Sequence, residues 1–198
     1  MALQSRPHRL NGGSASEVTD EVLAAQAVAL ADADAFEQLM RRHEQRIYYL
    51  HKRFTRDAGL AEELCQETFL RAWRKLASFE NRGPFGGWLT RLAYNVFLQH
   101  KRRHRNQVDA RSLEEPGVSS EAAERLAVPG PTGAGPDLER LLAALSEPEQ
   151  HILILTYAEG LSATEIGAML GLSAGTVKSQ IHRAKNKIRQ QFSIEAAR

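Results

Sequence analysis

Residues 162–184 read SATEIGAMLGLSAGTVKSQIHRA, and this stretch decides the fold of the C-terminal part of the chain. Ser162 and Glu165 have the spacing of a capping box, which opens a helix. Gly171 suits the position after a helix, because glycine readily adopts the left-handed backbone conformation. Ser173 then suits the N-cap of a second, longer helix. A short helix, a tight turn and a longer helix predict a helix-turn-helix.

The second helix of this motif has an apolar side and a side that is small, polar and basic. Ile166, Val177 and Ile181 fall on the side expected to pack between the helices. The recognition helix of such a motif presents its N-terminal residues to the major groove. Hydroxyl groups can bond bases or phosphates, and Lys or Arg can donate to guanine edges or phosphates. The residues expected to face DNA are Ser173, Ala174, Gly175, Thr176, Lys178, Ser179, His182 and Arg183.

Helix signals recur along the rest of the chain, and no alternating strand pattern bounded by turns is found. Residues 146–149 form a second capping box, and its helix is expected to stop at Gly160. Asp34 and Glu37 show the same pattern nearer the N-terminus. The sequence therefore predicts an all-α fold. Further helix starts are expected at Thr19 or Asp20, at Asp57, at Pro84 and at Asp137.

One segment has the composition of a flexible linker. Residues 107–136 are rich in proline, glycine, serine and glutamate. They divide the chain into two small helical domains, residues 19–106 and residues 137–198, of which the second carries the helix-turn-helix. Residues 1–18 are polar and include two adjacent glycines, so we expect a disordered tail there.

The formal net charge of +2 hides an uneven distribution of charge. Residues 36–106 carry fifteen basic and seven acidic side chains, whereas residues 107–136 carry two basic and five acidic ones. The C-terminal domain has seven of each, but five of its basic side chains lie within residues 178–189. Clustered basic charge on folded segments indicates a polyanion ligand, although a solvated helix face explains any single cluster equally well.

The composition argues against several classes of protein. The single cysteine, Cys65, cannot form an internal disulfide, which fits a reducing cytosol, and on an apolar helix face it is expected to be inert. No apolar run approaches the length of a membrane span, and none follows the basic N-terminus as in a signal peptide. The seven histidines are scattered. We expect a cytoplasmic protein, monomeric when free, without membrane insertion, catalytic residues, metal or cofactor.

Two separated blocks carry a resemblance to a known family. Residues 61–73 read AEELCQETFLRAW, and residues 85–95 read FGGWLTRLAYN. With the LSEPE of residues 145–149 and the helix-turn-helix, they follow the order found in extracytoplasmic-function (ECF) sigma factors of the sigma-70 family. The chain resembles this family over most of residues 30–192. The resemblance implies a subunit that binds core RNA polymerase and directs promoter-specific transcription initiation, with no chemistry of its own.

The resemblance also implies a role for each domain. The first would bind the polymerase and melt the −10 element, and the second would read the −35 element through the residues given above. An acidic helix would dock on the clamp coiled coil of the largest polymerase subunit, through Glu62, Glu63, Gln66 and Glu67. A loop at about residues 79–84 would hold a flipped base. The −10 residues implied are Glu80, Asn81, Arg82, Arg91, Asn95, Lys101, Arg102 and Arg103.

Members of the family are usually held inactive by an anti-sigma factor, so such a partner is implied as well. The chain departs from the family at three places. Gln99 stands where an acidic residue is frequent, Gly86 and Gly87 loosen the stretch before Trp88, and Gly167 lies within a helix where alanine is common. The helical spacing of Trp73, Phe85 and Trp88 predicts that they belong to the core rather than to a base-stacking surface.

Two other classes of protein fit parts of the pattern. A transcription regulator can end in a similar four-helix DNA-binding domain, but an α/β receiver or a ligand domain would precede it, whereas this N-terminal half is helical and basic. An enzyme acting on nucleic acid would need a metal site or a general base. The chain has no glycine-rich phosphate loop, and its one cysteine has no zinc-ligand partner.

Overall fold

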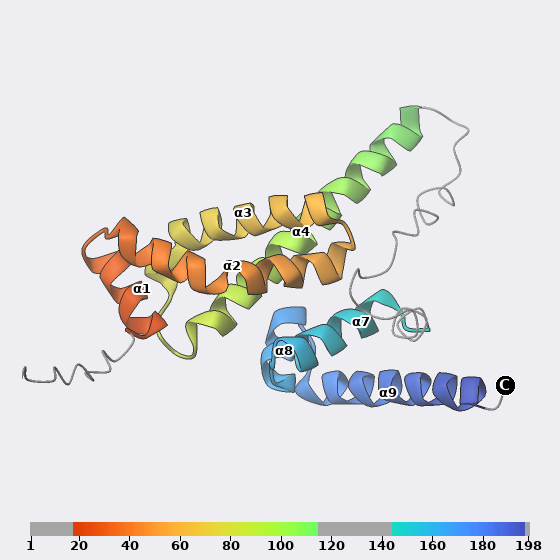
Figure 1. Ribbon diagram of the computed structural model, residues 1–198. Helices are drawn as coiled ribbons and strands as arrows, with labels where there is room; N and C mark the ends of the chain where they lie inside the picture. The colour runs from red at the N-terminus through yellow and green to blue at the C-terminus, as the bar shows by residue number, and fades with distance from the viewer. Residues whose placement is uncertain (1–17, 115–143, 197–198) are drawn as a thin grey trace, which may run out of the picture.

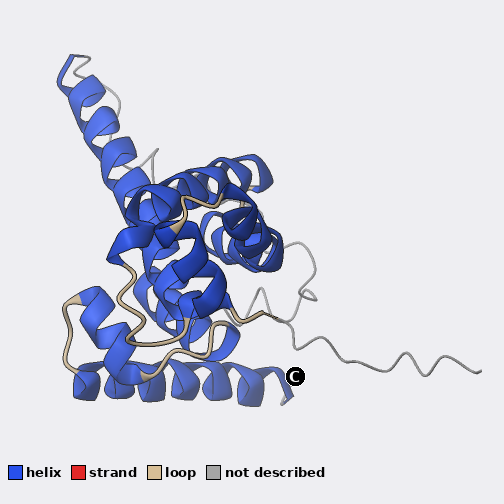
Figure 2. Ribbon diagram, turned by 90° about the vertical axis from the view of Figure 1, so that its left-hand side faces the viewer, coloured by secondary structure: helices blue, strands red, loops and turns tan. Residues whose placement is uncertain are grey.

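The structure is a computed structural model that describes residues 18–114 and 144–196. Every regular element within these two ranges is helical, which confirms the all-α fold (Figure 2). The helices form two units, one from each range. Residues 1–17, which make up nearly all of the expected tail, lie outside the described residues, and so do residues 115–136 of the expected linker. The helix start expected at Asp137 also lies outside them.

The first unit contains four α-helices and one short 3-10 helix. Figure 1 shows α2 and α3 lying alongside the first half of α4, with α1 packed across one end. The second half of α4 projects away from the other helices, and the helix reaches Glu114, inside the segment whose composition suggests a linker. The next helix-breaking residue is Pro116, so nothing in the sequence stops the helix earlier. The elements are α1 (Asp20–Ala29), α2 (Ala33–Thr55), α3 (Ala58–Lys75), η1 (Leu76–Ser78) and α4 (Phe85–Glu114).

Short polar side chains set the helix starts of the first unit. Thr19 accepts a hydrogen bond from Val22 N at 3.4 Å, and Asp57 accepts one from Leu60 N at 3.0 Å. The capping box expected at Asp34 is wrong, because Asp32 is the N-cap of α2 and its Oδ1 accepts from the backbone N of Asp34 at 3.0 Å. Asp32 has the extended backbone that an N-cap needs, which leaves Asp34 inside the first turn.

The core of the first unit takes apolar residues from all four of its α-helices, with aliphatic residues of α2 and α4 among the most deeply buried. Leu39, Ile47, Leu50 and Leu89 are completely buried. Each contributes roughly 2 kcal/mol to stability through the apolar area that it removes from water. Polar side chains are buried there too, among them His51, whose Nε2 is 2.9 Å from Oγ1 of the equally buried Thr68. Burial lowers the pKa of His51 to about 4, so its imidazole stays neutral at physiological pH.

The second unit contains α7 (Glu147–Leu153), a π-helical turn η2 (Ile154–Ala158), α8 (Ala163–Leu170) and α9 (Ala174–Ala196). Both capping boxes predicted here are confirmed, at Ser146 and at Ser162. Gly171 ends α8 in the left-handed conformation, with φ of 69°. Ile166 and Val177 are completely buried between α8 and α9. The predicted helix-turn-helix is therefore present.

The turn of this motif passes very close to α8 at Gly167. Leu172 N donates to Gly167 O at 2.9 Å, and a Cβ added to Gly167 would lie 2.6 Å from the backbone O of Leu172. Backbone atoms in a tight turn cannot move aside as the end of a long side chain can. This close approach explains why glycine stands where the family often has alanine.

Replacing Gly167 with alanine is therefore expected to destabilise the second unit by about 1–3 kcal/mol, the usual cost of overpacking. Glycine to alanine within a helix would otherwise gain up to about 1 kcal/mol. Urea unfolding followed by circular dichroism measures the difference. Gly87→Ala is the matched control, because a Cβ there meets nothing within 4 Å and should stabilise the protein slightly. Equal stability of Gly167→Ala and the unmodified protein would show that the turn can shift at no cost.

Candidate nucleic-acid interface

A cavity of about 400 Å³ opens between the loop that precedes α4 and the first turns of that helix. Its wall combines aromatic rings with charged and amide side chains. The rings of Phe79 and Trp88 have centroids 5.6 Å apart. Stacking surface beside hydrogen-bonding groups is what a protein needs to hold an unstacked base. The lining residues are Lys75, Ser78, Phe79, Glu80, Arg82, Gly83, Trp88, Arg91, Leu92 and Asn95.

The structure brings half of the residues implied for the −10 element to this cavity. Glu80, Arg82, Arg91 and Asn95 line it, and Arg82 Nε lies 2.6 Å from Glu80 Oε2. Asn81 lies apart from them, because its positive φ of 53° turns the chain, and it faces a shallow groove on α1. A base in the cavity would therefore meet residues from both the loop and α4.

The other three −10 candidates lie further along α4. Lys101, Arg102 and Arg103 are exposed and follow Asn95 by about two turns of helix. They do not line the cavity, and Lys101 forms an ion pair with Glu147 of α7. Their position on the same helix suits contact with nucleic-acid backbone beyond a base held in the cavity.

Six residues of the cavity wall are absent from the sequence-based site, among them Lys75, Ser78 and Trp88. Lys75 and Ser78 come from the end of α3 and from η1, before the loop. Trp88 is only partly buried, so its ring faces the cavity instead of lying wholly in the core. Of the other two aromatics expected in the core, Phe85 is 1% exposed as predicted, whereas Trp73 is 43% exposed. The sequence offered one indication for Lys75: it is a basic residue about one helical turn before the loop.

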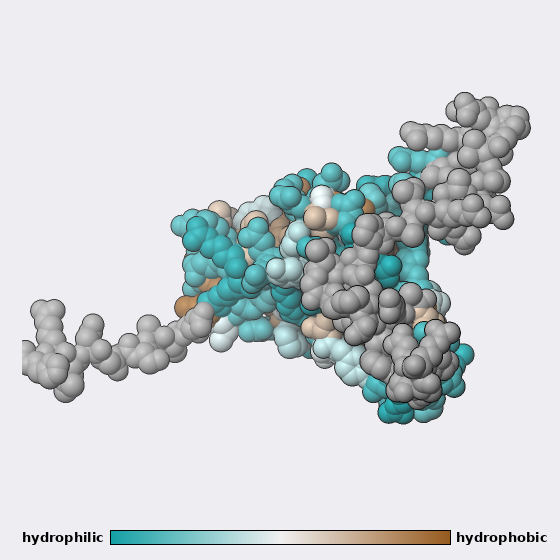
Figure 3. All heavy atoms as spheres, turned by 45° about the vertical axis from the view of Figure 1, so that its right-hand side comes forward, coloured by the Kyte–Doolittle hydropathy of each residue, from teal (hydrophilic) through white to brown (hydrophobic). Residues whose placement is uncertain are grey.

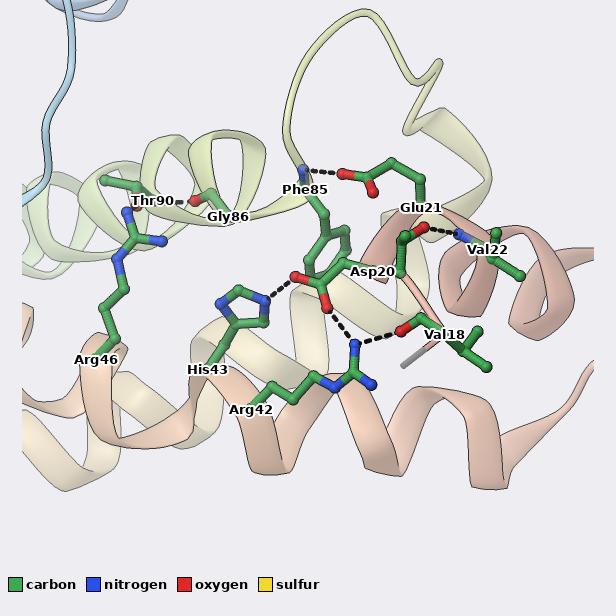
Figure 4. A network of polar contacts seen from close by, with 11 residues as sticks. Val18, Asp20, Glu21, Val22, Arg42, His43, Arg46, Phe85, Gly86 and Thr90 are labelled. Carbon is green, nitrogen blue, oxygen red and sulfur yellow. Dashed lines mark hydrogen bonds and ion pairs between the residues drawn. The ribbon is translucent and has the colours of Figure 1, made fainter. Parts of the chain in front are cut away.

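A network of polar contacts fixes the start of α4, and with it the loop (Figure 4). Phe85 N donates to Glu21 Oε1 of α1 at 3.3 Å, which satisfies one of the free N–H groups at the helix N-terminus. Asp20 Oδ1 accepts from Arg42 Nη1 at 2.9 Å, and its Oδ2 lies 2.6 Å from His43 Nε2. Desolvation by burial opposes ionisation of Asp20, but these hydrogen bonds outweigh it and lower the pKa of its carboxyl. Helix α1 therefore helps to position the loop that precedes α4.

The N-terminal turn of α9 is closed by its own hydroxyl groups. Ser173 Oγ accepts from Thr176 N at 3.0 Å and lies 2.9 Å from Thr176 Oγ1. Ala174 and Thr176 are partly buried, and Gly175 is exposed. The remaining candidates all lie on the exposed side of α9, as their spacing predicts: Lys178, Ser179, His182 and Arg183.

The basic side chains of α9 fall into two groups. Lys187 Nζ lies 2.8 Å from both carboxylate oxygens of Glu149, and Lys185 Nζ lies 4.9 Å from the centre of the Tyr157 ring. These two stabilise the second unit. Among the described residues no acidic side chain forms an ion pair with Lys178 or Arg183. Their charges remain available for phosphates or base edges.

The residues implied for polymerase binding share one surface of α3. Glu62, Glu63 and Gln66 are exposed, and Glu67 Oε1 accepts from Arg71 Nε at 2.5 Å. An apolar groove of about 400 Å³ runs beside them. Such a surface suits a basic amphipathic partner helix. The groove is lined by Phe36, Met40, Glu44, Cys65, Gln66, Phe69, Leu70 and Trp73.

The described residues hold no cluster of His, Cys, Asp or Glu side chains suited to a metal ion. Burial, and then the charges of Glu44 and Glu62, raise the pKa of Cys65 to about 11, which disfavours the reactive thiolate. No helix in the described ranges is long and apolar enough to cross a membrane. The face seen in Figure 3 is mostly hydrophilic, with apolar residues scattered over it.

Family models match both units of the chain. Residues 39–107 match sigma-70 region 2, and residues 137–188 match sigma-70 region 4. Together these matches cover more than half of the chain. The first includes the cavity and the acidic surface of α3, and the second includes the helix-turn-helix.

Individual relatives agree with the family models. The ECF RNA polymerase sigma factor SigE of Mycolicibacterium smegmatis is 35% identical over 80% of this chain, which covers 62% of that relative's length. The sigma factor CarQ of Myxococcus xanthus is 34% identical over 83% of this chain and 95% of its own length. A solved structure of the sigma factor RpoE with the anti-sigma factor NepR, from Bartonella quintana, is similar with a TM-score of 0.63 and 26% identity, and the match covers 80% of this chain and 97% of that one. The chain therefore belongs to the ECF sigma factors of the sigma-70 family.

Proposed function

We infer that this sigma factor recruits core RNA polymerase to promoters through three surfaces with separate tasks. The observation that carries this inference is that one chain combines two features. It has a cavity large enough for a base beside basic residues of α4, and a helix-turn-helix whose Lys178 and Arg183 are exposed. A transcription regulator that reads duplex DNA through a C-terminal helix-turn-helix does not need a cavity for an unpaired base. The chain itself contributes recognition, and the polymerase contributes the catalysis.

The first unit would open the −10 element. One base of the non-template strand would enter the cavity, where Arg82, Arg91 and Asn95 offer donors and acceptors and Trp88 offers a stacking surface. Lys101, Arg102 and Arg103 would bind the backbone of the adjoining duplex. The second unit would place α9 in the major groove of the −35 element, with Lys178 and Arg183 as its strongest contacts.

The α3 surface would hold the polymerase. Its exposed carboxylates complement a basic helix, and the groove beside them offers apolar area to the same partner. The family's mode of control suggests an anti-sigma factor as a further partner, and the related RpoE has been solved with one. Since polymerase and promoters lie in the cytoplasm, the protein would act there.

Transcription with purified components tests this function. Core polymerase, this protein and a library of genomic promoter fragments should yield transcripts with defined start sites, and core polymerase alone should not. Co-elution with core polymerase on a sizing column tests recruitment separately. Binding of the protein to DNA without binding to core polymerase would instead indicate a transcription regulator.

A further inference from the structure

The two units contact each other through α7 and Glu159 on one side and through α2 and α4 on the other. His151 of α7 is 6% exposed and lies among three aromatic rings of the first unit. Its ring centroid is 4.8 Å from that of Phe54, 5.2 Å from that of Phe97 and 5.8 Å from that of Tyr94. The Tyr94 hydroxyl lies 3.3 Å from His151 Nδ1. The His151 ring is therefore buried in the contact between the units.

A buried carboxylate lies beside this aromatic contact. Glu159 follows η2, and its side chain is 1% exposed. Glu159 Oε2 accepts from Arg46 Nε at 2.8 Å, and Oε1 lies 3.5 Å from Arg53 Nη1. Among the described residues Oε1 has no hydrogen-bond donor, so the two arginines of α2 supply all the compensation that this charge receives. A buried charge without such partners strongly disfavours the arrangement that buries it.

The guanidinium of Arg46, which reaches Glu159, lies close against the glycine at position 86. Arg46 Nη2 donates to Thr90 Oγ1 at 3.1 Å, and the guanidinium passes directly over Gly86 (Figure 4). A Cβ on Gly86 would lie 2.6 Å from Arg46 Nη1, the free end of a flexible side chain, so another residue there would make the guanidinium shift. The neighbouring Gly87 has open space around it. The departure from the family at Gly86 is thus matched to the contact between the units.

Other acidic groups of the second unit lie against basic groups of α4. Lys101, one of the residues implied in DNA binding, forms an ion pair with Glu147. Hydrogen bonds from Ser162 lower the pKa of Glu165, and the nearby charge of Arg91 lowers it further. Arg91 also lines the cavity. Carboxylates of the second unit therefore lie where DNA phosphates would be expected.

We propose that the ion pairs of Glu159 with Arg46 and Arg53 form a latch that holds the units closed and keeps carboxylates of the second unit beside Lys101 and Arg91 of α4, where they compete with DNA. The closed arrangement of the units does not depend on the proposed function. The inference that closure regulates promoter binding does rest on that function. Elements centred near −35 and −10 are about 25 base pairs, or ~85 Å, apart at about 3.4 Å per base pair. Units in direct contact cannot reach both, so the latch must open on a promoter.

The latch is expected to weaken in mild acid, because closure buries His151. Burial, with Lys101 and Arg56 nearby, lowers the pKa of His151 to about 4, although Glu147 acts in the opposite direction. In the open state the pKa returns to about 6.5, so protonation favours opening. Closure is strongest above about pH 6.5 and is lost as the pH falls toward about 4. The ratio of closed to open molecules should fall by about 20-fold from pH 7 to pH 5.

Two spin labels on the full-length protein measure the closure without DNA or polymerase. Ala77→Cys and Gln190→Cys place one label on each unit at exposed positions. Cys65 should stay unlabelled, because burial raises its pKa to about 11. Double electron–electron resonance then gives the distribution of distances at pH 7 and pH 5. Far-UV circular dichroism at both pH values verifies that the helices persist, and His151→Gln should remove the pH dependence.

The unmodified protein should give one narrow distance at pH 7. Glu159→Gln should raise the ratio of open to closed molecules by about tenfold or more. Gly86→Ala removes no charge but shifts the guanidinium of Arg46, so it should act in the same direction with a smaller effect, and it carries the test if Glu159→Gln does not fold. Gly87→Ala should keep the narrow distance. The latch is refuted if the unmodified protein is already open, or if both Glu159→Gln and Gly86→Ala stay closed.

Binding of labelled −10 single-stranded DNA separates the latch from the proposed function. Glu159→Gln and Gly86→Ala should bind this DNA more tightly than Gly87→Ala does. If the distances change as expected but no variant binds, the latch stands and the DNA-binding role of the first unit fails. If binding improves while the distances stay unchanged, the latch is wrong and the DNA-binding role stands.

Discussion

Replacing both Lys178 and Arg183 with alanine is expected to weaken binding of the holoenzyme to a −35 duplex by about 100-fold or more. Both side chains are exposed on the first turns of α9, and no acidic group among the described residues pairs with them. A good contact to a base or phosphate contributes about 1–3 kcal/mol, and the double variant loses two. Fluorescence anisotropy with a short promoter duplex, over a series of salt concentrations, measures the loss.

Lys187→Ala is the matched control for this prediction. It also removes positive charge from α9, one charge instead of two, but Lys187 is paired with Glu149 inside the second unit. We expect it to change DNA binding by less than about threefold, with a small loss of stability. The double variant should still bind core polymerase fully. Loss of polymerase binding would mean that the tasks of the two units have been assigned wrongly.

Reversing the charge of both Glu62 and Glu63 with lysine is expected to lower the affinity for core polymerase by about 100-fold. These carboxylates are exposed on α3, beside an apolar groove that suits a basic partner helix. Lysine there would place like charges together across the interface, which costs several kcal/mol. Titration of labelled protein with core polymerase gives the affinity directly.

Glu37→Lys makes the same kind of charge reversal on α2, where Glu37 pairs only with the exposed Arg41 among the described residues. It should leave polymerase binding nearly unchanged. In the absence of polymerase, the double variant Glu62→Lys, Glu63→Lys should bind −35 DNA as well as the unmodified protein does. An affinity for core polymerase equal to that of the unmodified protein would rule out α3 as the docking surface.

Local chemistry made most of the fold predictable from the sequence. The boxes at Ser146 and Ser162, the caps at Asp57 and Ser173, and the stop at Gly171 all depend on residues within a few positions of one another. The exposed side of α9 follows from helical periodicity in the same way. The capping box was wrongly placed at Asp34 because Asp32 and Asp34 are both suitable N-cap residues. Only the backbone conformation shows that Asp32 is the cap.

Contacts between distant segments explain what the sequence did not reveal. Lys75 joins the cavity only because the turn after α3 brings it opposite α4. Trp73 belongs to an apolar stripe, yet it lies over the edge of the core, where its ring contacts Phe36 and borders the groove. Arg46 and Glu159 are 113 positions apart. No periodic pattern encodes such a pair, which exists only once the two units have come together.

The length of α4 has a consequence for the geometry of promoter opening. The helix has 30 residues and is therefore about 45 Å long. It carries the wall of the cavity near its start and the cluster at Lys101–Arg103 further along, in a single rigid body. Under the proposed roles, the rigid helix α4 sets the distance between the unpaired base and the first duplex phosphates. The protein fixes this distance, and the flexible DNA adapts to it.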